Sequence, residues 1–391
     1  MPPGLVITIF LLGGCVLLLR DDVPRSWLLR RISFWGGLLL NEQGHWFAVL
    51  LAASVGLAIS EGDVSGPGWI TVGLAVLVAA GMIELLARSF PSRPALRRAM
   101  GSFEGFEAGS LAGPGRYLTT LALPFAMGRS RIKLRSNISY GPAAGRANLL
   151  DLYLPRSGEV TGPTLIYLHG GRFKMGSKRR EAQAIKCSLA RRGWAVISAN
   201  YQLVPQGTFP DYLIDLKRVI DWARTEGRSF GLDPDRIFLS GGSAGAHISA
   251  MAALTPDRAD LQPGFEQADT AVSGVIGLYG YYGSLDVRGG PISGLPSGPR
   301  DHVHPGAPPF LLIHGDHDSV MGPDGARALV DDLGDAGNQA SLAILPGAQH
   351  SFDLLRSVRT ENTIDAIEDF AAWAGAGGGP AEGRRVLGTG L

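Results

Sequence analysis

The chain has 391 residues, and its 36 Lys and Arg nearly balance its 35 Asp and Glu. A net charge of +1 supplies no global positive field, which argues against a nucleic-acid partner. Two cysteines, Cys15 and Cys187, are too few for a disulfide framework, and Cys15 lies in an apolar run.

Three apolar stretches with few charges come first: Gly4–Leu19, His45–Ser60 and Trp69–Ala87. The first two are near the lower length limit for crossing ~30 Å of hydrocarbon, and the third is comfortably long. We therefore expect residues 1–87 to be a transmembrane anchor of about three helices. The alternatives are buried core helices or, for the first stretch, a cleaved signal peptide. No basic residue precedes that stretch, which argues against the signal peptide.

The basic residues predict how this anchor is oriented. Four arginines lie between the first two stretches and four follow the third, whereas the turn between the second and third has none. The positive-inside rule then places the remainder of the chain in the cytoplasm of a multi-pass cell-membrane protein. Residues 88–130 follow as a basic linker, which either rests on anionic headgroups or is a solvated loop.

From residue 131 to 375 short apolar runs alternate with amphipathic helices. The predicted strands are Leu149–Leu154, Thr164–Leu168, Ala195–Ala199, Arg236–Leu239, Val272–Leu278, Pro309–Ile313 and Leu342–Leu345. The predicted helices are Asp211–Thr225, Ala244–Leu254, Pro323–Leu333 and Glu361–Trp373. Because the strands are continuously apolar, they favour a mostly parallel α/β sheet covered by helices on both faces. The Gly-rich residues 376–391 are expected to be a flexible tail.

Ser243 is the candidate nucleophile. It lies in Gly241-Gly242-Ser243-Ala244-Gly245, between a predicted strand and a predicted helix. This is the G-x-S-x-G pattern in the context that it requires, because a serine on a tight strand-to-helix turn tolerates only small neighbours. The helix that follows directs its amino end, which favours negative charge, toward the site.

A second glycine turn supplies candidate oxyanion donors. The strand Thr164–Leu168 runs into His169-Gly170-Gly171, where glycines let backbone N–H groups approach a substrate oxygen. We expect Gly170, Gly171 and Ala244 to form the oxyanion hole. We expect His169 to brace the turn.

The candidate acid and base each follow a predicted strand. Asp318 comes after the strand at 309–313, and His350 comes after the strand at 342–345. Carboxyl ends of parallel strands share one edge of the sheet, and the order Ser, Asp, His is the one expected for this topology. Asp316 and His317 are rivals in the same acidic loop. His247 is interpreted as a packing residue, and the remaining histidines lack a recognised metal-ligand spacing.

These motifs resemble those of the hormone-sensitive-lipase-like esterases, and more closely a bacterial branch of membrane-anchored lipases and esterases. The segments LIYLHGGRF, GLDPDRIFLSGGSAG, FLLIHGDHDSV and LPGAQHSFD occur here in that family's order, within about residues 146–375. The resemblance implies hydrolysis of carboxylic esters through an acyl-enzyme, without metal or cofactor. It assigns Ser243, Asp318 and His350 as the triad. Phe173 stands where the family often has Trp, which puts the shape of the pocket wall in doubt.

The expected function is that of a serine carboxylesterase or lipase acting on short- to medium-chain or lipid-like esters. An arylformamidase-like amide hydrolase or a deacetylase with the same triad is the alternative. A non-catalytic membrane scaffold is the alternative of another class, and the complete set of Ser, Asp and His argues against it. The sequence does not specify the oligomeric state.

Overall fold

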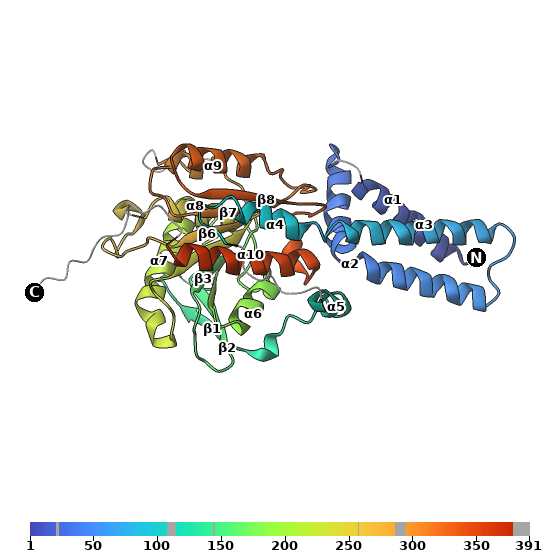
Figure 1. Cartoon of the computed structure of the whole chain (residues 1–391), viewed down its shortest axis with the longest axis horizontal. Coiled ribbons are helices and arrows are strands. Elements are labelled where there is room, and N and C mark those ends of the chain that lie inside the picture. Colours follow the sequence, from blue (N-terminus) through green and yellow to red (C-terminus); the bar gives the residue numbers. More distant parts are fainter. Residues whose placement is uncertain (21–22, 108–114, 144, 257, 286–294, 378–391) are drawn as a thin grey trace, which may run out of the picture.

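The computed structural model describes residues 1–20, 23–107, 115–143, 145–256, 258–285 and 295–377. An α/β body holds most of the chain, and a bundle of long helices projects from one end of it (Figure 1). The expected tail at 376–391 lies almost wholly outside the described residues.

Three helices form the bundle: α1 (Pro3–Arg20), α2 (Trp27–Ser60) and α3 (Gly68–Ala87). They contain the three apolar stretches that the sequence predicts to be helical. Helix α2 begins well before the expected second span, and Gln43 interrupts it with non-helical angles of φ −134° and ψ 21°. All three helices are long and apolar enough to cross a membrane.

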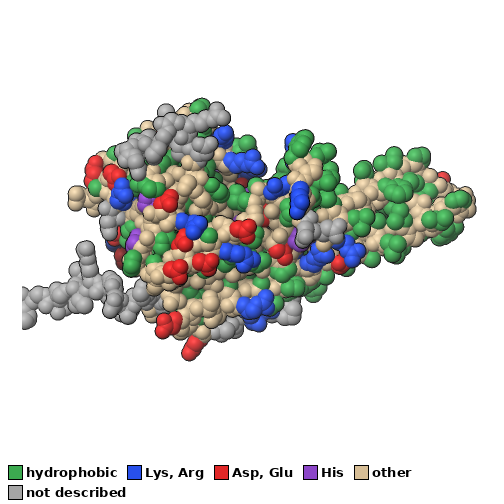
Figure 2. Space-filling model, turned by 90° about the horizontal axis from the view of Figure 1, so that it is seen from above, with side chains coloured by type: hydrophobic (Ala, Val, Ile, Leu, Met, Phe, Trp, Pro, Cys, Tyr) green, Lys and Arg blue, Asp and Glu red, His purple; other side chains and the backbone are tan. Residues whose placement is uncertain are grey.

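The bundle exposes many of its large apolar side chains. Ile70 is 77% exposed and Leu77 is 69% exposed, whereas Met82 between the helices is fully buried. Hydrophobic side chains are spread over the bundle surface that Figure 2 shows. Because water disfavours such a surface, it is compatible with a lipid environment.

Two short helices follow, α4 (Ser92–Met100) and α5 (Gly115–Ala122), within the segment 88–130 that the sequence suggests as a linker. Leu96 and Met100 of α4 are buried in the same apolar cluster as Phe370 near the carboxyl end of the chain. Helix α4 therefore packs as part of the α/β body, because its apolar residues share one face while its arginines share another.

Eight strands form one sheet in the order β1-β2-β4-β3-β5-β6-β7-β8. They are β1 (Ile132–Ser139), β2 (Leu149–Pro155), β3 (Thr164–Leu168), β4 (Ala195–Ala199), β5 (Ile237–Gly242), β6 (Gly274–Leu278), β7 (Phe310–Gly315) and β8 (Ala340–Leu345). Strands β1 and β2 are antiparallel to their neighbours, and the six others are parallel. The mostly parallel sheet confirms the predicted fold class.

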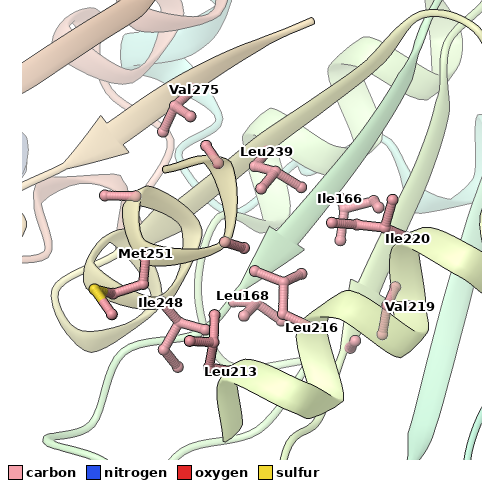
Figure 3. Packing of buried hydrophobic residues seen from close by; sticks show 14 of the residues in the cluster. Ile166, Leu168, Leu213, Leu216, Val219, Ile220, Leu239, Ile248, Met251 and Val275 are labelled. Atoms are coloured by element: carbon pink, nitrogen blue, oxygen red, sulfur yellow. The ribbon is translucent and has the colours of Figure 1, made fainter. Parts of the chain in front are cut away.

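Helices cover both faces of this sheet. They are α6 (Gln183–Arg191), α7 (Asp211–Arg224), α8 (Ala244–Ala253), α9 (Asp324–Asp335) and α10 (Val358–Gly375). Side chains of α7 and α8, including Leu216 and Ile248, pack on strand residues such as Leu239 on one face (Figure 3). Helices α4, α6 and α10 enclose a second core on the other face. Short 3-10 turns lie between these elements, at Arg129–Arg131, Glu226–Phe230, Ala259–Leu261, Pro299–His302 and Phe352–Leu354.

Candidate active site

Ser243 stands at the turn between β5 and α8. Its backbone has φ 54° and ψ −115°, a sparsely populated region that costs free energy and is found mainly at functional sites. A Cβ atom at Gly245 would lie 2.1 Å from the Leu168 carbonyl oxygen. A Cβ at Gly241 would lie 2.4 Å from the carbonyl carbon of Gly245. Both glycines of the G-x-S-x-G pattern are therefore required by the close approach of β5, α8 and β3.

Asp318 lies in the loop after β7, where four groups hold its carboxylate. Oδ1 accepts from the backbone N–H groups of Val320 and Met321, both at 2.9 Å. Oδ2 accepts from His350 at 2.7 Å and from His314 at 3.1 Å. Burial raises the pKa of this carboxyl, but the hydrogen bonds from His314 and His350 outweigh burial and hold the pKa well below its usual range. The carboxylate is thus kept ionised.

His350 lies in the loop after β8, as the sequence predicts. Its Nδ1–H donates to Asp318, which leaves Nε2 as the ring nitrogen able to accept a proton. The ring also contacts Tyr279 edge-on, with centroids 4.7 Å apart. His350 is 6% exposed, and so is Ser243.

The rival acid has a different set of partners. Asp316 Oδ1 accepts from the Gly347 backbone N–H at 2.6 Å and from His317 Nδ1 at 2.8 Å. It therefore ties the two loops together through their backbone, and it makes none of the contacts with the His350 ring that Asp318 makes. The His314 Nε2–H is shared between Asp318 Oδ2 and the Met321 carbonyl oxygen, at 3.1 Å from each.

The His-Gly-Gly turn lies against the serine. A Cβ atom at Gly170 would be 3.0 Å from the Cβ of Ser243. However, the Gly170 N–H donates to the carboxylate of Glu181 at 2.7 Å. This departs from the prediction that Gly170 is a free oxyanion donor, because a buried carboxylate already occupies its amide. Within the described residues, the Gly171 N–H has no such partner, and Ala244 opens α8, where N–H groups lack an intrahelical acceptor.

A buried polar cluster lies behind these loops. Tyr279 donates its hydroxyl hydrogen to Asp353 Oδ1 at 2.5 Å, and a Cβ at Gly242 would lie 2.4 Å from that hydroxyl. Burial, followed by the Glu181 carboxylate, raises the pKa of Asp353 to about 7. No sequence motif indicates this cluster, because Tyr279, Asp353 and Glu181 lie far apart in the chain.

A cavity of about 580 Å³ lies beside the His-Gly-Gly turn. Its lining includes His169, Tyr201 and Leu203 together with the polar Asn200 and Gln202. On another side of the turn, Phe173 stacks on Tyr212 and meets His247 edge-on. Among the described residues, no group of three or more His, Cys, Asp or Glu side chains is arranged to hold a metal ion.

Comparison with known families finds two matches in this region. Residues 150–289 match the family described as BD-FAE, and residues 295–376 match the prolyl oligopeptidase family. Together the two matches extend from β2 to the end of α10.

Curated relatives include two proteins of Mycobacterium tuberculosis. A probable carboxylic ester hydrolase, LipM, is 38% identical over 63% of this chain and 64% of its own length. Esterase LipQ is 37% identical over 60% of this chain and 61% of its own length. An isoprenylcysteine alpha-carbonyl methylesterase of Arabidopsis thaliana is 31% identical over 56% of this chain. The chain thus matches slightly less than two thirds of the length of these relatives.

Solved structures share the fold. Esterase 2 of Thermogutta terrifontis matches 63% of this chain and 95% of its own, with a TM-score of 0.53 and 22% identity. A bifunctional GH43-CE protein of Bacteroides eggerthii matches 62% of this chain and 38% of its own, with a TM-score of 0.55 and 22% identity. Sheet order and structural likeness agree on an α/β-hydrolase fold for the region from β2 to α10, and in sequence this region is similar to proteins named as carboxylic ester hydrolases and esterases.

Proposed function

We propose that this protein is a membrane-anchored serine carboxylesterase or lipase that hydrolyses short- to medium-chain or lipid-like esters. The observation that carries the proposal is the buried hydrogen bond from His350 Nδ1 to Asp318 Oδ2, at the same sheet edge as Ser243. Relatives named as esterases support the reaction class.

In the proposed reaction, His350 Nε2 accepts the proton of the Ser243 hydroxyl while the oxygen attacks the ester carbonyl. His350 then returns that proton to the departing alcohol, which leaves an acyl group on Ser243. A water molecule then attacks the acyl carbon while His350 accepts its proton, and His350 returns that proton to the Ser243 oxygen as the bond to the acyl group breaks and the acid leaves. Asp318 keeps the imidazole in the required tautomer and stabilises its charged form, for which its ionised state is suited.

We assign the oxyanion contacts to the N–H groups of Gly171 and Ala244. One donor of this type typically contributes ~3 kcal/mol to the stability of the transition state. Gly170 then has a different task. Its bond to Glu181 fixes the turn that presents Gly171.

The anchor gives the proposal its location. We assign residues 1–87 to a three-helix membrane anchor, 88–130 to the connecting segment and 131–375 to a cytoplasmic hydrolase. The helices support membrane attachment, and the arginine distribution supports the orientation. Protease treatment of intact cells should spare the hydrolase, and treatment of inverted vesicles should digest it.

Two relationships guide the choice of substrates. A relative named as a methylesterase of isoprenylcysteine favours esters with an apolar, lipid-like portion. The match of residues 295–376 to the prolyl oligopeptidase family supports a second candidate, amide hydrolysis by the same triad.

The test uses the full chain in detergent micelles with p-nitrophenyl esters of increasing acyl length and the matching anilides. We expect ester turnover that Ser243→Ala abolishes. Turnover of anilides without turnover of esters would favour the amide hydrolase. Equal turnover by the wild type and Ser243→Ala would contradict both.

A further inference from the structure

The two halves of α2 have different surroundings. Beyond Gln43 the helix runs along the bundle with α1 and α3, whereas the first half lies between the bundle and the α/β body (Figure 1). The first half has one exposed face and one buried face. Trp27 and Trp35 are 69% and 57% exposed, whereas Ser33 and Asn41 are nearly fully buried. Its buried face lies on the two loops that carry Asp318 and His350.

The loop of the acid accepts an arginine from this helix. Arg30 Nε donates to the Ser319 carbonyl at 2.8 Å, and its Nη2 donates to the Val320 carbonyl at 3.4 Å. Ser319 and Val320 are the next two residues after Asp318, and the Val320 N–H is one of the donors that hold the Asp318 carboxylate. Arg30 thus fastens the backbone that orients the acid.

Gln349 connects the helix to both loops at once. Its Oε1 accepts from the Ser319 N–H at 2.6 Å and from the His350 N–H at 3.0 Å. Its Nε2 donates to the Ser33 carbonyl of α2 at 3.2 Å. The side chain is fully buried, so these bonds are protected from competition with water.

Two further contacts fix the histidine loop from the helix side. Asn41 Nδ2 donates to the Gly347 carbonyl at 2.7 Å. Arg359 Nη1 pairs with Glu42 at 2.7 Å, and Arg359 Nη2 donates to the Pro346 carbonyl at 2.7 Å. The Arg359 and Glu42 side chains are 0% and 1% exposed, so the loss of either partner would leave a buried charge unpaired.

The helix also comes unusually close to the histidine loop. A Cβ atom at Gly37 would lie 3.2 Å from Gln349 Nε2 and 3.3 Å from Gln349 Cγ. At the neighbouring Gly36, a Cβ would meet only Leu19 and Cys15, at the ordinary distances of 3.8 and 3.9 Å. A side chain at position 37 would therefore press on Gln349 by a few tenths of an ångström at its Cβ, whereas a Cβ at position 36 fits at ordinary contact distances.

From these contacts we propose that the first half of α2, acting through Gln349, is a positioning element for Asp318 and His350. The membrane anchor is then part of what holds the triad in its working geometry, in addition to its role as a tether. This inference rests on the proposed esterase function. It assigns Gln349, Asn41 and Arg30 as positioning residues, since they act on the acid and the base and touch no substrate.

The adjacent glycines provide a matched test in the full chain in detergent micelles. We compare Gly37→Ala and Gly37→Leu with Gly36→Ala and Gly36→Leu, all of which raise helix propensity to a similar extent. Active sites are titrated with a fluorophosphonate, and kcat and KM are measured per titrated site. A shift of ~1 Å in a catalytic group can cost ~100-fold in rate.

We expect Gly37→Leu to lose ~10- to 100-fold in kcat with KM within about twofold, and Gly37→Ala to lose less. The Gly36 variants should keep kcat within about twofold. A general loss of folding would lower the number of titrated sites and leave kcat per site unchanged, which would overturn the proposal. Equal kcat in the two series would overturn it as well.

Hydrogen–deuterium exchange separates this inference from the esterase proposal. Peptides containing residues 316–321 and 346–351 should exchange faster in Gly37→Leu than in the wild type or Gly36→Leu. A wild type that neither reacts with the fluorophosphonate nor turns over esters, but shows this exchange pattern, would contradict the esterase proposal. It would leave standing the inference that the first half of α2 is a positioning element. Unchanged exchange in Gly37→Leu would contradict the role of α2 as a positioning element, even if the enzyme is active.

Discussion

The bundle and the α/β body use similar apolar residues in opposite ways. In the body, strand residues such as Leu239 and Ile276 are fully buried between helices. In the bundle, Ile70 and Leu77 are 77% and 69% exposed. Burial of apolar area contributes ~25 cal/mol per Å², so the body is stabilised by its own core. The bundle has a smaller core of its own, and its exposed apolar surface is compatible with a lipid environment.

The comparison also locates the chemistry. The loops that carry Asp318 and His350 lie at the carboxyl edge of the parallel strands. The first half of α2 contacts these loops from the bundle side.

The largest effect is expected within the body. Asp318→Asn should lower kcat by ~10⁴, because the imidazole loses the carboxylate that sets its tautomer. Asp316→Asn is the matched control in the same loop, and it should lower kcat far less because Asp316 contacts the Gly347 backbone and His317. Steady-state kinetics on one ester decides between them. The reverse ranking would move the acid role to Asp316.

The second prediction compares the two cores. Leu239→Ala should destabilise the body by about 2–5 kcal/mol, since the deleted atoms leave a cavity in a fully packed site. Leu77→Ala in the bundle should cost much less, because Leu77 is mostly exposed. Denaturant unfolding in detergent micelles, followed by tryptophan fluorescence, measures both. Equal losses would show that Leu77 is packed against protein.

The third prediction concerns the solvent of the bundle. Leu77→Asp should disfavour membrane insertion by about 2.5–3.5 kcal/mol, because a carboxylate then faces hydrocarbon. Met175→Asp, at a residue of the body that is 56% exposed, should have little effect. The fraction of protein recovered with the membrane reports the difference. Full recovery of Leu77→Asp would mean that this face of α3 meets water.

The last prediction is a pH dependence that originates in the body. Burial and the Glu181 carboxylate raise the pKa of Asp353 to about 7, above a value of about 3.9 in an unfolded chain. The folded state then binds the proton more tightly, so this stability is present below about pH 4 and is lost as the pH rises to about 7. Asp353→Asn should therefore reduce the change of the thermal unfolding midpoint with pH across that range. If the midpoint of the variant changes with pH as much as that of the wild type, Asp353 is not the source of the pH dependence.

Much of the α/β body could be predicted from the sequence because its signals are local. Seven strands were expected from continuous apolar runs, and two of them, Thr164–Leu168 and Ala195–Ala199, have the expected bounds. Strand β1 was missed because its exposed and half-buried residues, including Lys133 and Arg135, do not form an apolar run.

The missing parts of the site depend on distant contacts. Chain order and strand ends were enough to suggest Ser243, Asp318 and His350. The bond from Gly170 to Glu181 and the second donor His314 depend on how side chains meet in three dimensions. The contacts between α2 and the loop that carries His350 could not be predicted for the same reason, since Ser33 and Gln349 are separated by 316 positions in the chain.

The most direct test of the account is to map where a fluorophosphonate reacts. The full chain in native membranes is treated with the probe, and the peptide that gains its mass is identified by mass spectrometry. We expect one stoichiometric adduct on Ser243, absent in Ser243→Ala and formed much more slowly in His350→Ala. An adduct on another serine, or no adduct in protein that is folded, would contradict it.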